Sequence, residues 1–236
     1  MKIAAVADVH SGGVEDAERL RSLARGAARD ADVLVIGGDL TNHGRPEELE
    51  VLLDALDRCP IPVFVTLGNH DYESGNADGL SRLLAESTVH LLDRSSVVID
   101  GVGFSGVKGF CGGFDHTAAN AFGEALFKAW VTEGFLDAEA LKKELRRLET
   151  ERRVAILHYA PIRATVEGEP PEIHAFLGTS HLARALDEGE ATVAFHGHAH
   201  NGRFEGRTPG GVPVFNVALP VLEHEKLEHP YHIVEV

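Results

Sequence analysis

Five short polar groups along the chain have the residue types of a metal site. They are Asp8-Val9-His10, Gly38-Asp39, Gly68-Asn69-His70-Asp71, His158 and Gly197-His198-Ala199-His200. Imidazoles and carboxylates without a thiolate favour divalent cations such as Mn, Fe or Zn over the all-oxygen cage that calcium prefers. Two such cations about 3.5–4 Å apart, sharing a carboxylate, generate hydroxide near neutral pH for in-line attack on phosphorus. We therefore expect two divalent metal ions and phosphoester chemistry.

Each polar group follows a short apolar run that indicates a buried strand. The runs are Ile3–Ala7, Val33–Ile36, Val63–Thr66, Val154–Leu157 and Thr192–Phe195. Ligands of α/β sheets bind beyond the carboxyl ends of the strands, so the five groups are expected to converge there. Flanking glycines, such as Gly38 and Gly68, allow tight turns and close backbone approach. An extended backbone would aim the rings of His198 and His200 to the same side.

The rest of the pattern predicts an α/β fold whose second half is rich in strands. Helical spacing covers Glu15–Arg29 and resumes at Pro46, between the first three strands. Short strands, a glycine-rich loop and three helices are expected further on. They are strands Thr88–Leu92, Val97–Ile99 and Val102–Ser105, loop Gly106–His116, helices Ala118–Trp130, Asp137–Arg152 and Ser180–Gly189, and closing strands Val212–Ala218 and Tyr231–Val236.

Length and charge narrow the class of protein. The chain has 236 residues, with 22 Lys+Arg against 37 Asp+Glu, a formal net charge of −15. This length suits a single domain over residues 1–236. The acidic balance argues against the basic stripe that duplex binding requires and against a polybasic membrane anchor.

Three further features bear on the compartment. The only two cysteines, Cys59 and Cys111, form no CxxC pair and are expected to be small thiols in a reducing environment. No apolar run approaches the roughly 18 residues of a membrane span. No secretory signal precedes Asp8, so the cytoplasm is the expected location.

The order of the motifs resembles the calcineurin-like metallophosphoesterases. Asp-x-His, Gly-Asp, Gly-Asn-His-Asp, a lone later His and Gly-His-x-His follow one another from Asp8 to His200. The resemblance implies a four-layer αββα sandwich with two mixed β-sheets flanked by helices. It implies one metal held by Asp8, His10 and His200, and a second held by Asn69, His158 and His198, with Asp39 bridging them. It further implies that His70 contacts the phosphate and assists the leaving oxygen, and that Asp71 orients His70.

The stretch Gly38–Glu48 resembles the small bacterial cyclic-nucleotide phosphodiesterases of this family. The Ser/Thr protein phosphatases differ here, since they carry Asp-Arg-Gly after Gly-Asp and Gly-Asn-His-Glu later. The sequence His158-Tyr159-Ala160-Pro161 departs from the His-His-Pro often found in the cyclic-nucleotide enzymes. No amphipathic basic helix for membrane docking, as in the lipid-processing members, is evident.

We therefore expect a phosphodiesterase that acts on a small phosphodiester through a metal-bridging hydroxide, with a cyclic nucleotide as one candidate substrate. A phosphomonoesterase or a manganese-dependent nuclease is the alternative, since a local basic groove would still admit nucleic acid. A metal-free interaction scaffold is disfavoured because all seven ligands are present. Nothing in the sequence indicates the oligomeric state. His196 is expected in the core. Several other residues remain candidates for contacts with the pocket or the phosphate, namely Asn42, His43, Arg45, Cys111, His116, Arg163 and Arg203.

Overall fold

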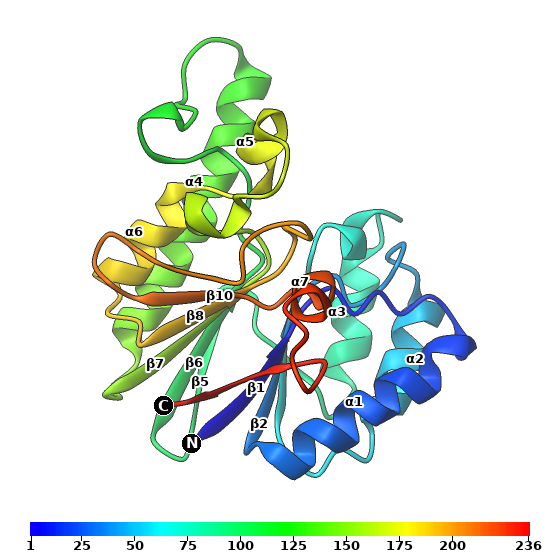
Figure 1. Cartoon of the computed structure of the whole chain (residues 1–236). Helices are drawn as coiled ribbons and strands as arrows, with labels where there is room; N and C mark the ends of the chain where they lie inside the picture. The colour runs from blue at the N-terminus through cyan, green and yellow to red at the C-terminus, as the bar shows by residue number, and fades with distance from the viewer.

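Two β-sheets pack face to face in the computed structural model, which describes residues 1–236 (Figure 1). The five-stranded sheet has the order β11-β1-β2-β3-β4, and only β11 runs antiparallel to its neighbour. Its strands are β1 (Lys2–Val6), β2 (Val33–Gly37), β3 (Val63–Thr66), β4 (His90–Leu91) and β11 (His232–Glu235). The first three strands are continuous apolar runs because both faces of this sheet are covered.

The six-stranded sheet has the order β5-β6-β7-β8-β10-β9, with antiparallel strands only at its two edges. Its strands are β5 (Ser95–Ile99), β6 (Val102–Val107), β7 (Arg152–Leu157), β8 (Val193–His196), β9 (Glu205–Arg207) and β10 (Pro213–Asn216). The rings of Phe64 on β3 and Phe104 on β6, 4.9 Å apart, meet in the core between the two sheets.

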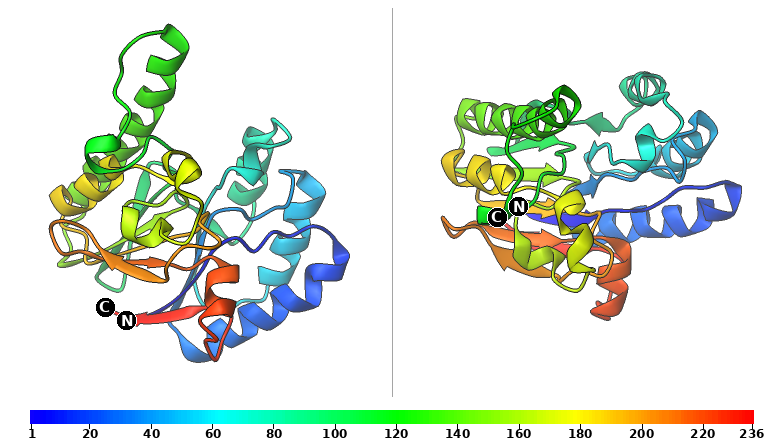
Figure 2. Two further views of the ribbon diagram at one scale, coloured as in Figure 1. Left: turned by 45° about the horizontal axis from the view of Figure 1, so that its top comes forward. Right: turned by 90° about the horizontal axis from the view of Figure 1, so that it is seen from above.

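Helices cover the outer faces of both sheets, as the three views show (Figures 1 and 2). The helices α1 (Ala17–Asp30), α2 (Pro46–Leu56) and α3 (Ala77–Ala85) accompany the first sheet, and α4 (Ala125–Arg147) and α6 (Ser180–Glu188) accompany the second. The short α5 (His174–Leu177) and α7 (Leu219–His224) lie in the later connections. Single 3-10 turns are η1 (Val14–Asp16), η2 (His70–Tyr72), η3 (Asp115–Thr117), η4 (Arg163–Val166) and η5 (Pro171–Ile173). The expected αββα sandwich is confirmed.

The long helix α4 is the main difference from the sequence-based expectation. The predicted helices Ala118–Trp130 and Asp137–Arg152 are wrong, because one helix runs unbroken from Ala125 to Arg147. Asp137, expected as a helix cap, is buried within this helix and paired with Arg94 at 2.6 Å. Gly134 does not interrupt the helix; it lets the backbone of Cys111 approach, since a Cβ there would lie 2.8 Å from the Cys111 carbonyl oxygen. The sequence pattern does not predict α3, α5, β9 or α7.

No helix combines the length and the apolar character needed to cross a membrane. Cys59 and Cys111 are both free thiols, and Cys111 is buried.

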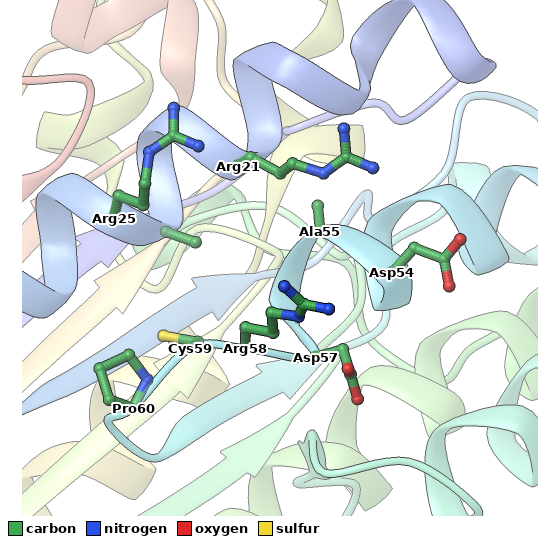
Figure 3. Close-up of a pocket in the computed structure, with 9 residues that line it drawn as sticks. Arg21, Arg25, Asp54, Ala55, Asp57, Arg58, Cys59 and Pro60 are labelled. Carbon is green, nitrogen blue, oxygen red and sulfur yellow. The ribbon is translucent and has the colours of Figure 1, made fainter.

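A cavity of about 530 Å³ lies against α1 and α2, far from the polar strand ends (Figure 3). It is lined by Arg21, Arg25 and Arg58, and by Cys59 and Pro60 just before β3. Figure 3 shows that the three guanidinium groups do not meet at one point. Arg25 is already paired with Glu18 at 2.7 Å. This cavity therefore lacks the convergent charges of an anion site.

Candidate metal centre

The parallel strands of both sheets bring the five polar groups to one edge of the sandwich. Asp8 and Asp39 each follow a strand of the first sheet by two residues, and Asn69 follows β3 by three. His158 comes directly after β7, and His198 follows β8 by two residues. The Asp, Asn and His side chains predicted from sequence therefore lie together between the two sheets.

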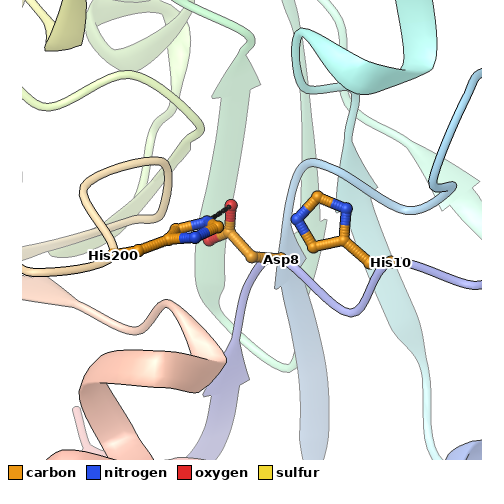
Figure 4. Close-up of side chains that lie close together, drawn as sticks. All are labelled: Asp8, His10 and His200. Atoms are coloured by element: carbon orange, nitrogen blue, oxygen red, sulfur yellow. Dashed lines mark hydrogen bonds and ion pairs between the residues drawn. The ribbon is translucent and has the colours of Figure 1, made fainter.

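The first cluster consists of Asp8, His10 and His200 (Figure 4). Nε2 of His200 lies 3.0 Å from Oδ1 of Asp8. Figure 4 shows the two imidazole rings on opposite sides of the Asp8 carboxylate. One ligand atom from each residue lies within 4.8 Å of the others, so one ion could contact all three. Nδ1 of His10 is buried without a hydrogen-bond partner.

The second cluster consists of Asp39, His158 and His198, with Asn69 beside them. Nδ1 of His158 donates to the carbonyl oxygen of Gly37 at 3.0 Å. In the neutral ring this bond leaves a lone pair on Nε2, and that lone pair faces Oδ1 of Asn69 at 2.9 Å and Oδ1 of Asp39 at 3.4 Å. Three electron-pair donors thus point at one place, which is the arrangement that a cation requires.

Asp39 belongs to the second cluster and also groups with His10 of the first cluster and with His70. Its Oδ2 lies 3.8 Å from Nε2 of His10, and its Oδ1 faces Nε2 of His158. Oδ1 also accepts the backbone N–H of His70 at 2.9 Å. One carboxylate therefore reaches the imidazoles of the first cluster and of the second, as a bridging ligand would.

The backbone of the site is strained in the way that functional sites often are. Asp8, His10, Asp39 and His198 all have positive φ, at 57°, 42°, 48° and 70°. Residues other than glycine seldom occupy this region, and such conformations cost of order 1–3 kcal/mol each. Their concentration in the candidate ligands indicates that the fold holds these side chains in place at the expense of local stability.

Glycines next to the ligands leave no room for a side chain. Gly38 has a φ of +85°, and a Cβ there would lie 2.5 Å from Nδ1 of His158. A Cβ on Gly197 would overlap Oδ2 of Asp8. These glycines let the two sheets approach closely enough for their ligands to meet.

The pKa values of the two buried aspartates shift in opposite directions. Burial alone would raise the pKa of Asp8, but the hydrogen bond with His200 and the nearby histidines bring that pKa below its ordinary value. Burial raises the pKa of Asp39, and the adjacent carboxylate of Asp8 raises it further. Two carboxylates buried side by side repel each other unless cations lie between them.

The imidazole rings also differ. Burial lowers the pKa of His10, and burial next to the imidazole of His158 lowers the pKa of His198 to about 3. The hydrogen bond with Asp8 raises the pKa of His200. Rings that are neutral at physiological pH offer the lone pairs that metal ligands need.

His70 is held by contacts that the sequence does not reveal. Its Nδ1 donates to the carbonyl oxygen of Asn42 at 2.7 Å, and its ring lies 4.7 Å from that of His10. The carboxylate of Asp71 is turned away and accepts hydrogen bonds from Leu40, Thr41 and Gly68. Asp71 therefore acts on His70 only indirectly, by joining the loop after β2 to the loop after β3 through these hydrogen bonds.

The two closing histidines do not share one side, so the expectation of an extended backbone is wrong. His198 has a φ of 70° and the chain turns through residues 198–202. The ring of His198 packs 4.9 Å from His158, whereas His200 reaches Asp8. His196 is a core residue, as expected, because its ring is fully buried and bonded to Thr165 and to the backbone of Gly197.

Three of the residues left open by the sequence are paired with acidic side chains. His43 faces Glu73 at 3.2 Å, Arg203 pairs with Glu167 at 3.0 Å, and Arg163 pairs with Asp115 at 3.2 Å. Sequence reasoning missed Tyr159, whose ring lies 4.4 Å from that of His198. Its position directly after His158 was the only available signal.

Comparison with known proteins identifies the family. The calcineurin-like phosphoesterase family profile matches residues 1–202, and the chain belongs to this family. None of the curated proteins matches the sequence.

Three similar solved structures share the fold. A phosphopantetheinyl hydrolase from Mycobacterium tuberculosis has 19% identity over 99% of this chain and 95% of its own, with a TM-score of 0.72. A protein from Thermus thermophilus has 15% identity over 93% of this chain and 90% of its own, with a TM-score of 0.60. A putative 5'-nucleotidase from Staphylococcus aureus has 16% identity over 91% of this chain and 48% of its own, with a TM-score of 0.57.

The family uses a pair of divalent metal ions, and the residues present fit such a pair. The close group of Asp8, His10 and His200, and the lone pairs that converge at His158, would each be satisfied by a cation. The protein is therefore a metal-dependent phosphoester hydrolase of the calcineurin-like family.

Proposed function

We propose that the protein hydrolyses small phosphodiesters at a centre of two divalent ions. The observation that carries the proposal is the position of Asp39, whose two carboxylate oxygens face His10 and His158 in different clusters. In this proposal Asp8, His10 and His200 hold one ion, Asn69, His158 and His198 hold the other, and Asp39 bridges them. The ions, with Mn, Fe or Zn suited to these ligands, would polarise the phosphate and lower the pKa of water.

His70 is the residue best placed to assist the leaving group. Because its Nδ1 donates to Asn42, its Nε2 is directed away from the turn and can carry a proton toward the substrate. Donation of that proton from Nε2 to the departing oxygen would avoid the release of a free alkoxide. Asp71 would keep this geometry by tying the backbone of Gly68 to that of Thr41.

Charge favours a small diester over a longer anion. Two divalent cations would change the formal charge from −15 to about −11, which leaves an acidic exterior. A diester carries a single negative charge, whereas a monoester carries up to two and a nucleic acid carries one for every phosphate. The likeness of Gly38–Glu48 to the cyclic-nucleotide phosphodiesterases supports the same choice.

We infer a cytoplasmic location from the two free thiols and the acidic character.

The test is a panel of substrates with chelator-treated protein reloaded with Mn²⁺, Fe²⁺ or Zn²⁺. We expect bis-p-nitrophenyl phosphate and cyclic nucleotides to be hydrolysed faster than p-nitrophenyl phosphate or DNA. Asp39→Asn should abolish turnover, while Asp54→Asn on the exposed side of α2 serves as the matched control. Hydrolysis of monoesters alone would overturn the diesterase proposal, and cleavage of DNA would favour the nuclease.

A further inference from the structure

A second pocket, of about 450 Å³, opens directly beside the metal centre. Asn69 lines it, and the same side chain faces His158 at 2.9 Å. Tyr159 also lines it, with its ring 4.4 Å from that of His198. When a phosphoester binds at the metal centre, one of its organic groups could therefore extend into the pocket.

Three of the nine residues that line the pocket are aromatic. Tyr72, Phe110 and Tyr159 come from three separate segments, the turn after β3, the loop after β6 and the loop after β7. The rings of Phe110 and Tyr159 lie 5.8 Å apart. Tyr72 is 44% exposed and Phe110 is partly buried, so each presents ring surface that the core does not use. Such ring surfaces stack with flat aromatic groups whatever their substituents.

Lys108 places a cation among these rings. Its ammonium lies 4.7 Å from the ring centre of Phe110, 5.0 Å from that of Tyr159 and 5.4 Å from that of Tyr72. It donates one hydrogen bond, to the carbonyl oxygen of Gly109 at 2.8 Å, while the nearby carboxylate of Asp137 is paired with Arg94 at 2.6 Å. Burial lowers the pKa of this amine. Its other N–H groups can serve a ligand.

The remaining charges argue against an anionic occupant. Arg94 is committed to Asp137 at 2.6 Å and to Glu133 at 2.9 Å. Asp93 lines the pocket without an ion pair, and burial raises its pKa. Three carboxylates against two cations leave the pocket slightly negative, so a further negative group on the substrate would be disfavoured.

We propose that this pocket binds the organic group esterified to the phosphate, and that it selects a flat, uncharged aromatic group with a hydrogen-bond acceptor on its edge. The rings of Tyr72 and Phe110 stack on the group, and Lys108 donates to the acceptor. The substrate class is thus an aryl or nucleobase-bearing phosphoester. This inference rests on phosphoester binding at the proposed metal centre, and it concerns selectivity, not turnover.

Trp130 provides a readout that does not depend on turnover. It is the only tryptophan of the chain, and its ring lies 6.2 Å from that of Phe110. The experiment titrates Mn²⁺-loaded protein with methylphosphonate, phenylphosphonate and pyridylphosphonates and follows Trp130 fluorescence. Phenylphosphonate is expected to bind about tenfold more tightly than methylphosphonate because of stacking. A pyridylphosphonate should bind about tenfold more tightly again, because it adds an acceptor for Lys108.

Variants separate the two contributions. Phe110→Leu should remove most of the preference for phenyl over methyl. Lys108→Met should abolish the preference for pyridyl over phenyl and keep the preference for phenyl over methyl. Lys128→Met, on the exposed part of α4, is the matched control and should change neither ratio. Thermal unfolding and metal content verify that each variant folds and loads.

The outcomes are distinct from those of the proposed function. Equal affinity for methyl and phenyl probes, or preferences unchanged in both Phe110→Leu and Lys108→Met, would overturn the pocket assignment. The diesterase proposal would be untouched by that result, since it depends on turnover. A protein that hydrolyses only monoesters could still show the aryl preference, which would support the pocket and contradict the diesterase.

Discussion

Nε2 of His158 lies 3.4 Å from Oδ1 of Asp39, and the two residues follow strands of different sheets. The candidate metal centre therefore forms only when the two sheets are packed together. A cation that binds both residues must stabilise this packing, because it binds the folded chain and lacks a preformed site in the unfolded one.

Metal binding is expected to raise the melting temperature. At a free Mn²⁺ concentration 100 times the dissociation constant, one ion adds about 2.7 kcal/mol. For a chain of this size that corresponds to an increase of about 5–10 °C. Differential scanning calorimetry with and without a chelator measures the shift. Asp39→Asn should lose most of it, and an equal shift in this variant would show that the ions bind elsewhere.

His70→Asn should slow turnover without loss of metal. General acid catalysis contributes about 10²- to 10⁴-fold, so kcat should fall within that range. Metal content should stay unchanged, because the proposed ligand sets do not include the His70 ring. His200→Ala should instead lower the metal content of the purified protein. The comparison uses steady-state kinetics and elemental analysis, and a His70→Asn protein with normal kcat would remove His70 from the mechanism.

Gly38→Ala should damage the centre far more than a similar change elsewhere. A Cβ at this position would lie 2.5 Å from Nδ1 of His158 and would displace that ring from Asp39. Gly75 has a comparable φ of +74° with nothing within 4 Å of its Cβ position, so Gly75→Ala carries the same backbone strain without the clash. Activity and metal content should drop in Gly38→Ala and persist in Gly75→Ala. Similar losses in both would indicate that strain, not the contact with His158, is decisive.

Tyr231, directly before the C-terminal strand β11, is tied to α1 by a pH-dependent contact. The hydroxyl of Tyr231 donates to Asp30 at 2.5 Å. Arg29 and then Tyr231 lower the pKa of Asp30 from 3.8 to about 2. Because the folded pKa is the lower one, the contribution to stability is present above about pH 4 and disappears as pH falls toward 2.

Asp30→Asn should therefore be less stable than the wild-type protein at pH 7. Urea unfolding at pH 7, 4 and 3 should show the difference shrinking at the lowest pH, whereas Asp57→Asn, at the end of α2, should show none. A difference that stays constant over this range would mean that the charge of Asp30 is not involved.

The sequence is sufficient to predict the fold and the convergence of the candidate site residues at one edge of the sheets. Continuous apolar runs that end in Asp8, Asp39 and His158 already place these residues at one sheet edge, because strand direction determines where the ends meet. The same local logic fails where tertiary contacts decide. Asp is a residue type common at helix N-termini, yet Asp137 lies inside α4, where it pairs with Arg94.

Other features depend on backbone geometry or on distant segments. The positive φ of His198 separates two rings that sequence spacing alone would place together. The partner of His70 is the carbonyl oxygen of Asn42, and a carbonyl has no signature in the residue type. Lys108 contacts Tyr72 and Tyr159, which are about 36 and 51 residues away from it in the sequence. No local sequence pattern therefore predicts the pocket that they line.

The most direct test of the account is a titration of chelator-treated protein with Mn²⁺ while hydrolysis of bis-p-nitrophenyl phosphate is followed. We predict that turnover rises only as the second ion binds and reaches its plateau at about two ions per chain, as a shared Asp39 requires. In Asp39→Asn the plateau should be absent at any Mn²⁺ concentration that saturates the wild-type protein. Full diester turnover with one ion or none, or wild-type turnover in Asp39→Asn, would contradict the two-ion centre.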